Sequence, residues 1–361
     1  MIYFPIVKTR DAELRGVCWL ADKTKTTATP LFELTRSRKT KKASHGPIEK
    51  RLETIAQEYG HTPFGIDLTS FVDLKNEEIE AFYDYRNGFG NWVSFVERQQ
   101  TVFPSLIPTL IVSDEDIDTE EKYVETHKKE SENLSDSFQK VIYRIPGDYD
   151  AIEFDLDRFF EPTNPPIVLL DMGFIPKEKG KEFAKIAEQQ LMTIHQPQYG
   201  IKHVILAGSS FPKDPTENNG GNDHGENILE EVIMFEQCRK TYADLIYGDY
   251  ATINPLPNER AGGNGWVPRI DFPTEKAIIY HRRRKKKNEN NYAPAYIEVA
   301  RTVVEDDRFS RLRKRLGDQC WGISQILLAA EGYPPSMAPA FWISVRIHLH
   351  ITLQCLIRSK T

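Results

Sequence analysis

The sequence predicts an α/β protein with a (β/α)8, TIM-barrel-like fold, long inserted loops and a C-terminal extension. Short apolar segments recur eight times, stretches with helical periodicity and charged faces separate them, and each segment ends at a polar residue. Strands that are apolar on both faces belong to parallel sheets or barrels covered by helices. Eight such units match a closed barrel, whose ligand site lies at the carboxyl ends of the strands. A doubly wound open sheet is the alternative, because sequence does not show closure.

The eight expected strands follow one another at intervals that suit a strand plus a helix. They lie within residues 1–9, 29–35, 62–69, 104–114, 140–148, 165–174, 201–211 and 243–255. Helical periodicity covers the stretches 47–59, 76–85, 148–160, 177–194 and 227–239. In the sixth strand, PPIVLLDMGF, a continuous apolar run stops at Asp171. We therefore expect a barrel domain over residues 1–280 and an extension over 281–361 that packs on it.

Some connections are long for a barrel. Residues 114–136 are strongly charged with almost no apolar side chains, which predicts a solvated helix or a mobile arm. Residues 212–227 are polar, rich in glycine and directly follow a strand, where a loop often covers a site. A further long connection runs over 254–269.

Composition excludes several classes of protein. The 361 residues carry a formal net charge of −6, with 28% charged and 40% hydrophobic residues, which is typical of a soluble globular protein. No apolar run reaches the roughly 18 residues of a membrane span, and the first residues do not resemble a signal peptide. The four cysteines form no CxxC pair, which disfavours zinc clusters and disulfides. Reduced thiols and a cytoplasmic location are expected.

Five short motifs, taken in order, resemble those of a known family. They are YFPIVKTRDAELRGV, ATPLFELT, LLDMGF, YGDYATINP and WISVRIHLHIT. Together they resemble the phage-type beta protein family of phages and bacterial mobile elements, over nearly the whole chain. The resemblance implies a cytoplasmic protein of phage–host conflict, either in anti-phage defence or encoded by a phage, and it assigns no catalytic role to any residue. One departure is that Leu349 separates His348 from His350, where adjacent histidines are expected.

The strand ends are expected to bring three aspartates, a glutamate and two cations to one mouth of the barrel. These candidate catalytic residues are Lys8, Glu33, Asp67, Arg144, Asp171 and Asp249. Grouped carboxylates repel one another unless a hard cation, a shared proton or a Lys or Arg neutralises them. Asp67, Asp171 and Asp249 are therefore candidate ligands of Mg²⁺ or another divalent cation. Structural ion pairs of Lys8 with Glu33 and of Arg144 with Asp171 are the alternative.

The last two strands supply candidate ligand-binding residues. Ser209 and Ser210 end the seventh strand, and barrels often hold a phosphate after the last two strands. Gly248 would allow a ligand to approach the backbone, and Tyr250 could stack on a ring or donate a hydrogen bond. We therefore expect a polar pocket for a phosphate-bearing or otherwise anionic ligand. A tight turn with buried tyrosines is the alternative.

Six consecutive cations follow His281. A solvated loop is the plain interpretation of such a run, and the alternative is a contact with nucleic-acid phosphates through Arg282, Arg283, Arg284 and Lys285. The motif RSRKTKK at 36–42 would reinforce this contact if the two loops lay on one face. The overall acidity of the chain argues against nonspecific coating of nucleic acid.

The stretch WISVRIHLHITLQCLIR alternates apolar and polar residues as a strand does, although a helix also fits. As a strand it would place His348 and His350 on one face, an arrangement of zinc ligands in metal-dependent barrel hydrolases. A packing role is the simpler interpretation.

Three classes of function agree with these features. The first is a metal-dependent hydrolase of nucleotides or phosphodiesters, with Lys8 or Arg144 stabilising the developing charge. The second is a non-catalytic recognition module that binds nucleic acid or a partner protein of a defence system. The third is a pyridoxal-phosphate barrel with Lys8 as the Schiff-base lysine, which would need a phosphate loop such as GSSF or GDY.

Overall fold

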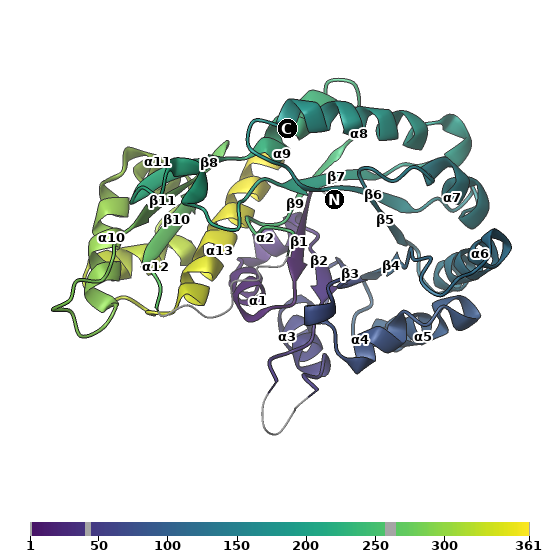
Figure 1. Ribbon diagram of the computed structural model, residues 1–361, viewed down its shortest axis with the longest axis horizontal. Helices are drawn as coiled ribbons and strands as arrows, with labels where there is room; N and C mark the ends of the chain where they lie inside the picture. Colours follow the sequence, from purple (N-terminus) through teal and green to yellow (C-terminus); the bar gives the residue numbers. More distant parts are fainter. Residues whose placement is uncertain (1, 40–44, 257–264, 361) are drawn as a thin grey trace.

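The computed structural model describes residues 2–39, 45–256 and 265–360, and its central feature is a closed barrel of eight parallel strands (Figure 1). Neighbouring strands follow the order of the chain, and the last one closes the barrel by pairing with the first. The strands are β1 (Tyr3–Lys8), β2 (Leu31–Leu34), β3 (Phe64–Leu68), β4 (Leu106–Leu110), β5 (Ile142–Pro146), β6 (Ile167–Phe174), β7 (Val204–Ser209) and β9 (Ile246–Asp249). Each lies within a predicted segment, so the TIM-barrel-like fold is confirmed.

Helices cover the outside of the barrel. They are α1 (Asp11–Cys18), α2 (Asp22–Thr27), α3 (Glu49–Tyr59), α4 (Glu77–Phe82), α5 (Arg86–Gln100), α6 (Glu120–Ser137), α7 (Ile152–Phe159), α8 (Gly180–Ile194) and α9 (Glu230–Cys238). In α8 the buried residues Ala184, Ala187, Leu191 and Ile194 recur every three or four positions, which places them on one face of the helix. The same periodicity identified α3, α4, α7, α8 and α9 in the sequence.

The charged stretch 114–136 contributes α6 to this outer layer. Of its two predicted states the helix is confirmed and the mobile arm is wrong, because α6 packs against α5 and α7. Its buried face includes polar residues, where the sequence predicted exposure to solvent. His127 is buried there, and Oε1 of the buried Glu130 accepts a hydrogen bond from the backbone N–H of Ile111 at 2.9 Å.

Alternate side chains of the barrel strands fill the interior. The inward-facing cluster contains Phe4, Ile6, Leu31, Ile107, Ile142, Ile167, Leu169, Ile205, Ala207, Ile246 and Tyr250. Gly248 lies within this packing, because a Cβ atom there would be 2.9 Å from Cβ of Ala207 and 3.0 Å from Cγ2 of Ile205. The absent side chain of Gly248 therefore makes room for the barrel core, where we expected it to make room for a ligand.

A second, antiparallel sheet lies beside the barrel (Figure 1). Its strands, in order across the sheet, are β10 (Arg269–Pro273), β11 (Ala277–Arg282) and β8 (His224–Ile228). The stretch 212–227 enters this sheet through β8, and none of its residues lines the cavity at the strand ends of the barrel, so its expected role as a cover is wrong. β11 runs across residue 280, where we expected the barrel domain to end and the C-terminal extension to begin. The second sheet therefore contains residues from both sides of that boundary.

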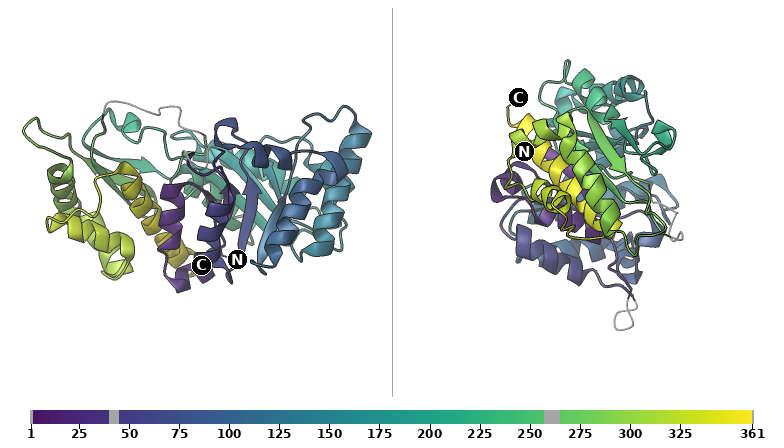
Figure 2. Two further views of the ribbon diagram at one scale, coloured as in Figure 1. Left: turned by 90° about the horizontal axis from the view of Figure 1, so that it is seen from below. Right: turned by 90° about the vertical axis from the view of Figure 1, so that its left-hand side faces the viewer.

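Within residues 265–360, four helices accompany the second sheet. They are α10 (Ala293–Glu305), α11 (Asp307–Leu316), α12 (Trp321–Ala330) and α13 (Pro339–Arg358). Figures 1 and 2 show α13, in yellow, between the barrel and the second sheet. Two apolar stripes run along it, with Ile347, Ile351 and Cys355 in the core around the barrel and Trp342, Val345, Leu349 and Leu353 in the core of the second sheet. The helix is thus confirmed over the strand for this stretch.

The length and hydropathy of α13 would suit a membrane span, which differs from the expectation that no apolar run was long enough. However, 67% of its apolar window is buried inside the fold. A helix that is apolar on several sides and covered by protein is a core helix.

A buried ion pair fastens α13 to the second sheet. Nη1 of Arg346 lies 2.5 Å from Oδ2 of Asp271 on β10, and both side chains are at most 5% exposed. Nε of Arg346 donates to Oγ1 of Thr252 at 3.0 Å, and its guanidinium lies 4.1 Å from the centroid of the Phe211 ring. One side chain of α13 therefore contacts both the second sheet and loops of the barrel.

Candidate functional site

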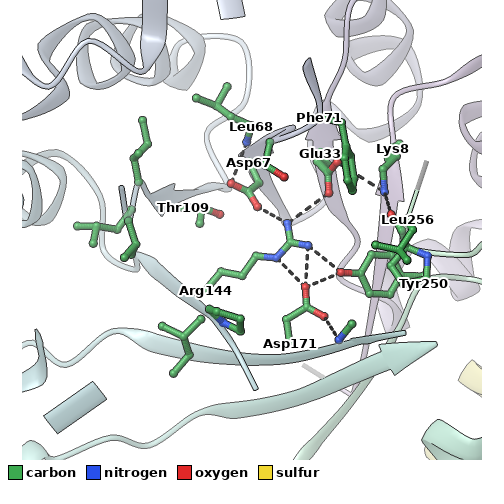
Figure 3. A pocket seen from close by; sticks show the side chains of 18 of the residues that line it. Lys8, Glu33, Asp67, Leu68, Phe71, Thr109, Arg144, Asp171, Tyr250 and Leu256 are labelled. Carbon is green, nitrogen blue, oxygen red and sulfur yellow. Dashed lines mark hydrogen bonds and ion pairs between the residues drawn. The ribbon is translucent and has the colours of Figure 1, made fainter. Parts of the chain in front are cut away.

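A cavity of about 320 Å³ opens at the carboxyl ends of the barrel strands (Figure 3). Its charged lining residues are Lys8, Glu33, Asp67, Arg144 and Asp171, and all five were predicted. Each of them lies two residues beyond an inward-facing position of its strand. Because side chains alternate along a strand, each points to the same side as that inward-facing position, and the five converge. The register adds to this, since Glu33 is the cross-strand partner of both Lys8 and Asp67.

Arg144 occupies the centre of the site (Figure 3). Its Nε and Nη2 donate to Oδ2 of Asp171 at 3.1 and 2.8 Å, and its Nη1 donates to Oδ2 of Asp67 at 2.5 Å and to Oε2 of Glu33 at 3.3 Å. Nη2 also donates to the hydroxyl oxygen of Tyr250 at 2.9 Å. These bonds use all five N–H groups of the guanidinium. The predicted pair of Arg144 and Asp171 is therefore one part of a larger network.

Lys8 forms the second cationic point. Its Nζ lies 3.6 Å from Oε1 of Glu33 and donates to the carbonyl oxygen of Pro255 at 3.3 Å. The rings of Phe71 and Tyr250 lie 5.2 and 5.4 Å from Nζ, within the range of a cation–π contact. The predicted pair of Lys8 and Glu33 is present. A Schiff-base role for Lys8 stays a prediction.

Two buried polar atoms of the lining lack a hydrogen-bond partner in the part of the chain that the structure describes. They are Oε1 of Glu33 and Oγ1 of Thr109. Sequence reasoning missed Thr109, although it lies two residues beyond the inward-facing Ile107 on β4. It also missed Phe71, which follows the end of β3. Buried polar groups are rarely left unpaired in proteins, so these atoms offer contacts to a ligand.

The pocket is electrostatically acidic. Among the lining residues that the structure describes, two cations and three carboxylates leave a formal charge of −1. Burial raises the pKa of Asp67, and Glu33 adds to this effect while Arg144 opposes it. Burial alone would lower the pKa of Arg144, but Tyr250 and the surrounding carboxylates raise it well above the usual value. The guanidinium of Arg144 therefore stays charged, and its positive charge is balanced by several carboxylates at once.

The strand β6 becomes irregular at Asp171, the residue that ends its apolar run. The register between β6 and β7 shifts between Asp171 and Phe174, and Gly173 has a positive φ of 60°. Oδ1 of Asp171 accepts the backbone N–H of Gly173 at 3.0 Å, which leaves Oδ2 for Arg144. The aspartate thus fixes the local bend of the chain and also takes part in the site.

Asp249 does not join the other carboxylates. It faces away from the barrel interior, where Oδ1 accepts the hydroxyl of Tyr3 at 2.6 Å and Oδ2 lies 2.7 Å from Nε2 of His350 on α13. Burial would raise the pKa of Asp249, but His350 and Tyr3 lower it below the usual value. Asp249 therefore connects β1, β9 and α13 behind the barrel wall.

The two candidate serines also lie outside the cavity lining. Oγ of Ser209 donates to the carbonyl oxygen of Ile253 at 3.0 Å. Oγ of Ser210 contacts the carbonyl oxygen of Ile228 at 2.8 Å and Oε2 of Glu231 at 2.5 Å. Both hydroxyls thus hold neighbouring loops together, and Tyr250 is the predicted ligand-binding residue that lines the cavity.

Glu231 gives the protein a testable dependence on pH. Burial raises its pKa from 4.5 to about 8, so the folded state favours the protonated carboxyl. Its contribution to stability is complete below about pH 4.5 and is lost as the pH rises to about 8. Glu231→Gln resembles the protonated acid, so we expect it to flatten this decline by up to about 1.4 kcal/mol per pH unit. Urea unfolding of the parent and the variant at several pH values between 5 and 8 measures this change. If the free energy of unfolding depended on pH equally in both proteins, the prediction would be contradicted.

The candidate metal ligands do not fit a common ion. Asp67 and Asp171 both bind the guanidinium of Arg144, and Asp249 lies behind the barrel wall. Within residues 2–39, 45–256 and 265–360, no group of three or more His, Cys, Asp or Glu side chains has an arrangement that could hold a metal. Asp67 and Asp171 are instead paired with the cationic side chain of Arg144, as the ion-pair alternative expected for Asp171.

The basic run after His281 is partly engaged within the second sheet and its helices. Arg282 donates to the carbonyl oxygen of Gly221 and to Oγ1 of Thr216. Arg283 pairs with Glu289 at 2.6 Å and with Glu298 at 2.9 Å. Arg284 and Lys285 are exposed, and Nζ of Lys285 donates to the carbonyl oxygen of Glu289 at 2.6 Å. Binding of nucleic acid by these four residues stays a prediction.

The two C-terminal histidines point to different surroundings because α13 is a helix. Nε2 of His348 lies 3.1 Å from the carbonyl oxygen of Trp19, and burial lowers the pKa of His348 to about 4. His350 contacts Asp249. The two rings therefore do not form a zinc site together.

The fold and site define a class of protein, a closed α/β barrel with an arginine-centred acidic pocket at its strand ends. Residues 3–355 match the Beta protein family, and the chain belongs to this family. It is 26% identical to Protein beta of Enterobacteria phage P4 over 358 residues, which are 98% of this chain and 92% of that protein. The predicted relation to phage proteins is confirmed.

Among solved structures, the spore cortex-lytic enzyme SleL of Bacillus megaterium QM B1551 is similar with a TM-score of 0.36 and 11% sequence identity. The similarity covers 84% of this chain and 67% of that one.

Proposed function

We propose that the protein is a recognition module whose strand-end cavity binds a small ring compound with several hydroxyl or amino groups, and that it acts through this binding in phage–host conflict. The observation that carries the proposal is the excess of hydrogen-bond acceptors in the cavity. Three carboxylates face two cations, and the N–H groups of Arg144 are already donated. A ligand that donates hydrogen bonds complements such a lining.

An anionic ligand suits this cavity less well. A phosphate would have to displace Glu33, Asp67 or Asp171 from Arg144, and the formal charge of −1 would repel it. A hydroxyl or amino group would instead meet Oε1 of Glu33 and Oγ1 of Thr109, which are buried and have no hydrogen-bond partner among the described residues. Oε1 of Glu33 keeps its ion pair with Nζ of Lys8 at 3.6 Å.

Aromatic side chains explain why the proposed ligand contains a ring. Phe71, Tyr83, Phe174 and Tyr250 all line the cavity. Their faces can stack on a ring, while carboxylates beside them accept hydrogen bonds from its substituents. We propose binding in preference to metal-dependent hydrolysis, because the carboxylates are bound to Arg144 rather than arranged around a common ion.

Asp171→Asn tests the site directly. We expect the substitution to weaken ligand binding at least roughly tenfold, because it removes one of the three carboxylate charges in the lining that would attract a hydrogen-bond donor. Stability should change little, since Arg144 keeps Asp67 and Glu33 as counter-charges. Thermal-shift screening of nucleosides, amino sugars, polyamines and nucleoside monophosphates identifies the ligand, and calorimetry then compares the variants.

Asp136→Asn on α6 is the matched control, because Asp136 is exposed and carries the same charge. Equal binding by both variants, or a preference for the monophosphates that depends on Asp171, would refute the proposal. In cells, Asp171→Asn but not Asp136→Asn should remove the effect of the protein on phage plating efficiency at equal protein levels.

A further inference from the structure

A second cavity, of about 390 Å³, lies at the N-terminus of α1 and is lined by four arginines. These are Arg10, Arg36, Arg38 and Arg51, and we call the cavity the arginine cleft. Its other walls include Ala340 and Ile343 at the start of α13. α1 packs against both α13 and α3 (Figure 1), so the cleft is bounded by elements distant in the sequence.

The arginines of the cleft are largely free of carboxylate partners. Arg51 pairs with Asp11 at 2.5 Å, and its buried Nε has no hydrogen-bond partner among the described residues. Within the same part of the chain, Arg10, Arg36 and Arg38 form no ion pair. Nε of Arg36 donates to the carbonyl oxygen of Asp73 at 3.1 Å, which holds the guanidinium in place. This pattern is the opposite of the strand-end cavity, where every N–H of the arginine is used.

The cleft is strongly cationic. Within the described part of the chain, four arginines with Asp11 and Glu13 give its lining a formal charge of +2. Glu13 is buried and accepts the backbone N–H of Lys8 at 2.7 Å, and burial raises its pKa to about 7 despite the opposing effect of Lys8. Below that pH the charge of the lining therefore approaches +3. The first turn of α1 adds the partial positive charge of a helix N-terminus.

We propose that the arginine cleft binds the phosphate group of a small phosphate-bearing ligand, such as a nucleotide. Guanidinium groups match phosphate oxygens with paired hydrogen bonds, and several of them around one cavity compensate the charge of a phosphate. The volume lies in the range of small-ligand pockets, which favours a small molecule over the backbone of a nucleic acid. This site is independent of the ligand proposed for the strand-end cavity.

Calorimetry of the full chain with pyrophosphate and with adenosine 5′-monophosphate tests the cleft. The double variant Arg36→Gln/Arg38→Gln should weaken binding roughly 100-fold, because each arginine contributes a charge-assisted contact. Arg284→Gln/Lys287→Gln is the charge-matched control, since both residues are exposed in the second basic motif, and it should bind as the parent does. Absence of binding by the parent, or an equal loss in the control, would overturn the proposal.

Asp11→Asn gives a result of opposite sign. It removes a carboxylate from the lining and frees Arg51, so phosphate binding should become several-fold tighter. Weaker or unchanged binding would count against the cleft, and the melting temperature shows whether each variant is folded. A single-stranded oligonucleotide is the other ligand to compare. If it bound more tightly than pyrophosphate and lost affinity in both double variants, a nucleic-acid surface would replace the small-ligand site.

Discussion

Arg144→Met is expected to lower the free energy of unfolding by about 3–5 kcal/mol at pH 8. The guanidinium contacts Glu33, Asp67 and Asp171, all of which lie in or beside the barrel interior. Methionine fills much of the volume but leaves these carboxylates with Lys8 as the remaining cation among the described residues of the cavity lining. Removing one partner of a buried charge network costs more than replacing the whole network by apolar groups.

The loss should depend on pH in a defined direction. Without Arg144 the carboxylates repel one another, which raises their pKa values above those of the unfolded chain. The folded variant then favours their protonated forms, so its deficit is largest at pH 8 and shrinks toward pH 5. Urea unfolding at the two pH values measures this difference. Arg144→Lys keeps the charge without the five N–H groups and should be intermediate, whereas a methionine variant as stable as the parent at pH 8 would contradict the prediction.

Asp271→Asn should also lower the free energy of unfolding by about 3–5 kcal/mol. Asp271 is the buried carboxylate opposite Arg346, and it also accepts a hydrogen bond from Nε of Arg269 at 2.8 Å. Burial lowers the pKa of Arg346, and Asp271 opposes that effect. Asparagine has nearly the same shape but no charge, so the variant leaves a guanidinium buried without its counter-charge. Equilibrium unfolding in urea measures the loss.

The double variant Asp271→Asn/Arg346→Met separates charge from packing. It removes both members of the pair, so much of the lost stability should return. A double variant as unstable as the sum of the two single variants would show that the pair matters through its contacts and not through its charges.

The barrel and most of the strand-end site could be predicted because both depend on local patterns. A strand buried on both faces is a continuous apolar run, and a polar residue that ends it is conspicuous. Parallel strands bring such residues to one mouth, which is why Lys8, Glu33, Asp67, Arg144 and Asp171 were found together. The pairing of the carboxylates with Arg144, as opposed to a metal, depends on side-chain geometry that the sequence does not contain.

Asp249 was misplaced because both faces of a barrel strand are buried. In β9 the inward-facing Ile246 and the outward-facing Tyr247 are both largely apolar, so the alternation of polarity that normally identifies a face is absent. A shift of one position turns a side chain to the other face. Neighbouring residues of a strand point to opposite faces, so Asp249 and Tyr250 could not both face the barrel interior. The ring of Tyr250 lies in the interior, and this contrast is the signal that could have placed Asp249 outside.

The second sheet could not be predicted, because its pairings are distant in sequence. β8 pairs with β11, about fifty residues later, and the strand HGENI has little apolar character. The helix α13 was ambiguous for a different reason. Its two apolar stripes lie on opposite sides, so apolar residues fall at nearly every second position, as they do in a strand.

The position of α13 between the two cores also affects how the protein folds during translation. Barrel and second sheet are both encoded before residue 339, yet each packs against this helix, and α1 approaches it so closely that a Cβ on Gly16 would lie 2.7 Å from Ile347. During translation, apolar surface of both parts stays uncovered until the helix has emerged from the ribosome. A nonsense codon just before residue 339 would therefore leave two cores open to aggregation, although it spares every strand of the protein.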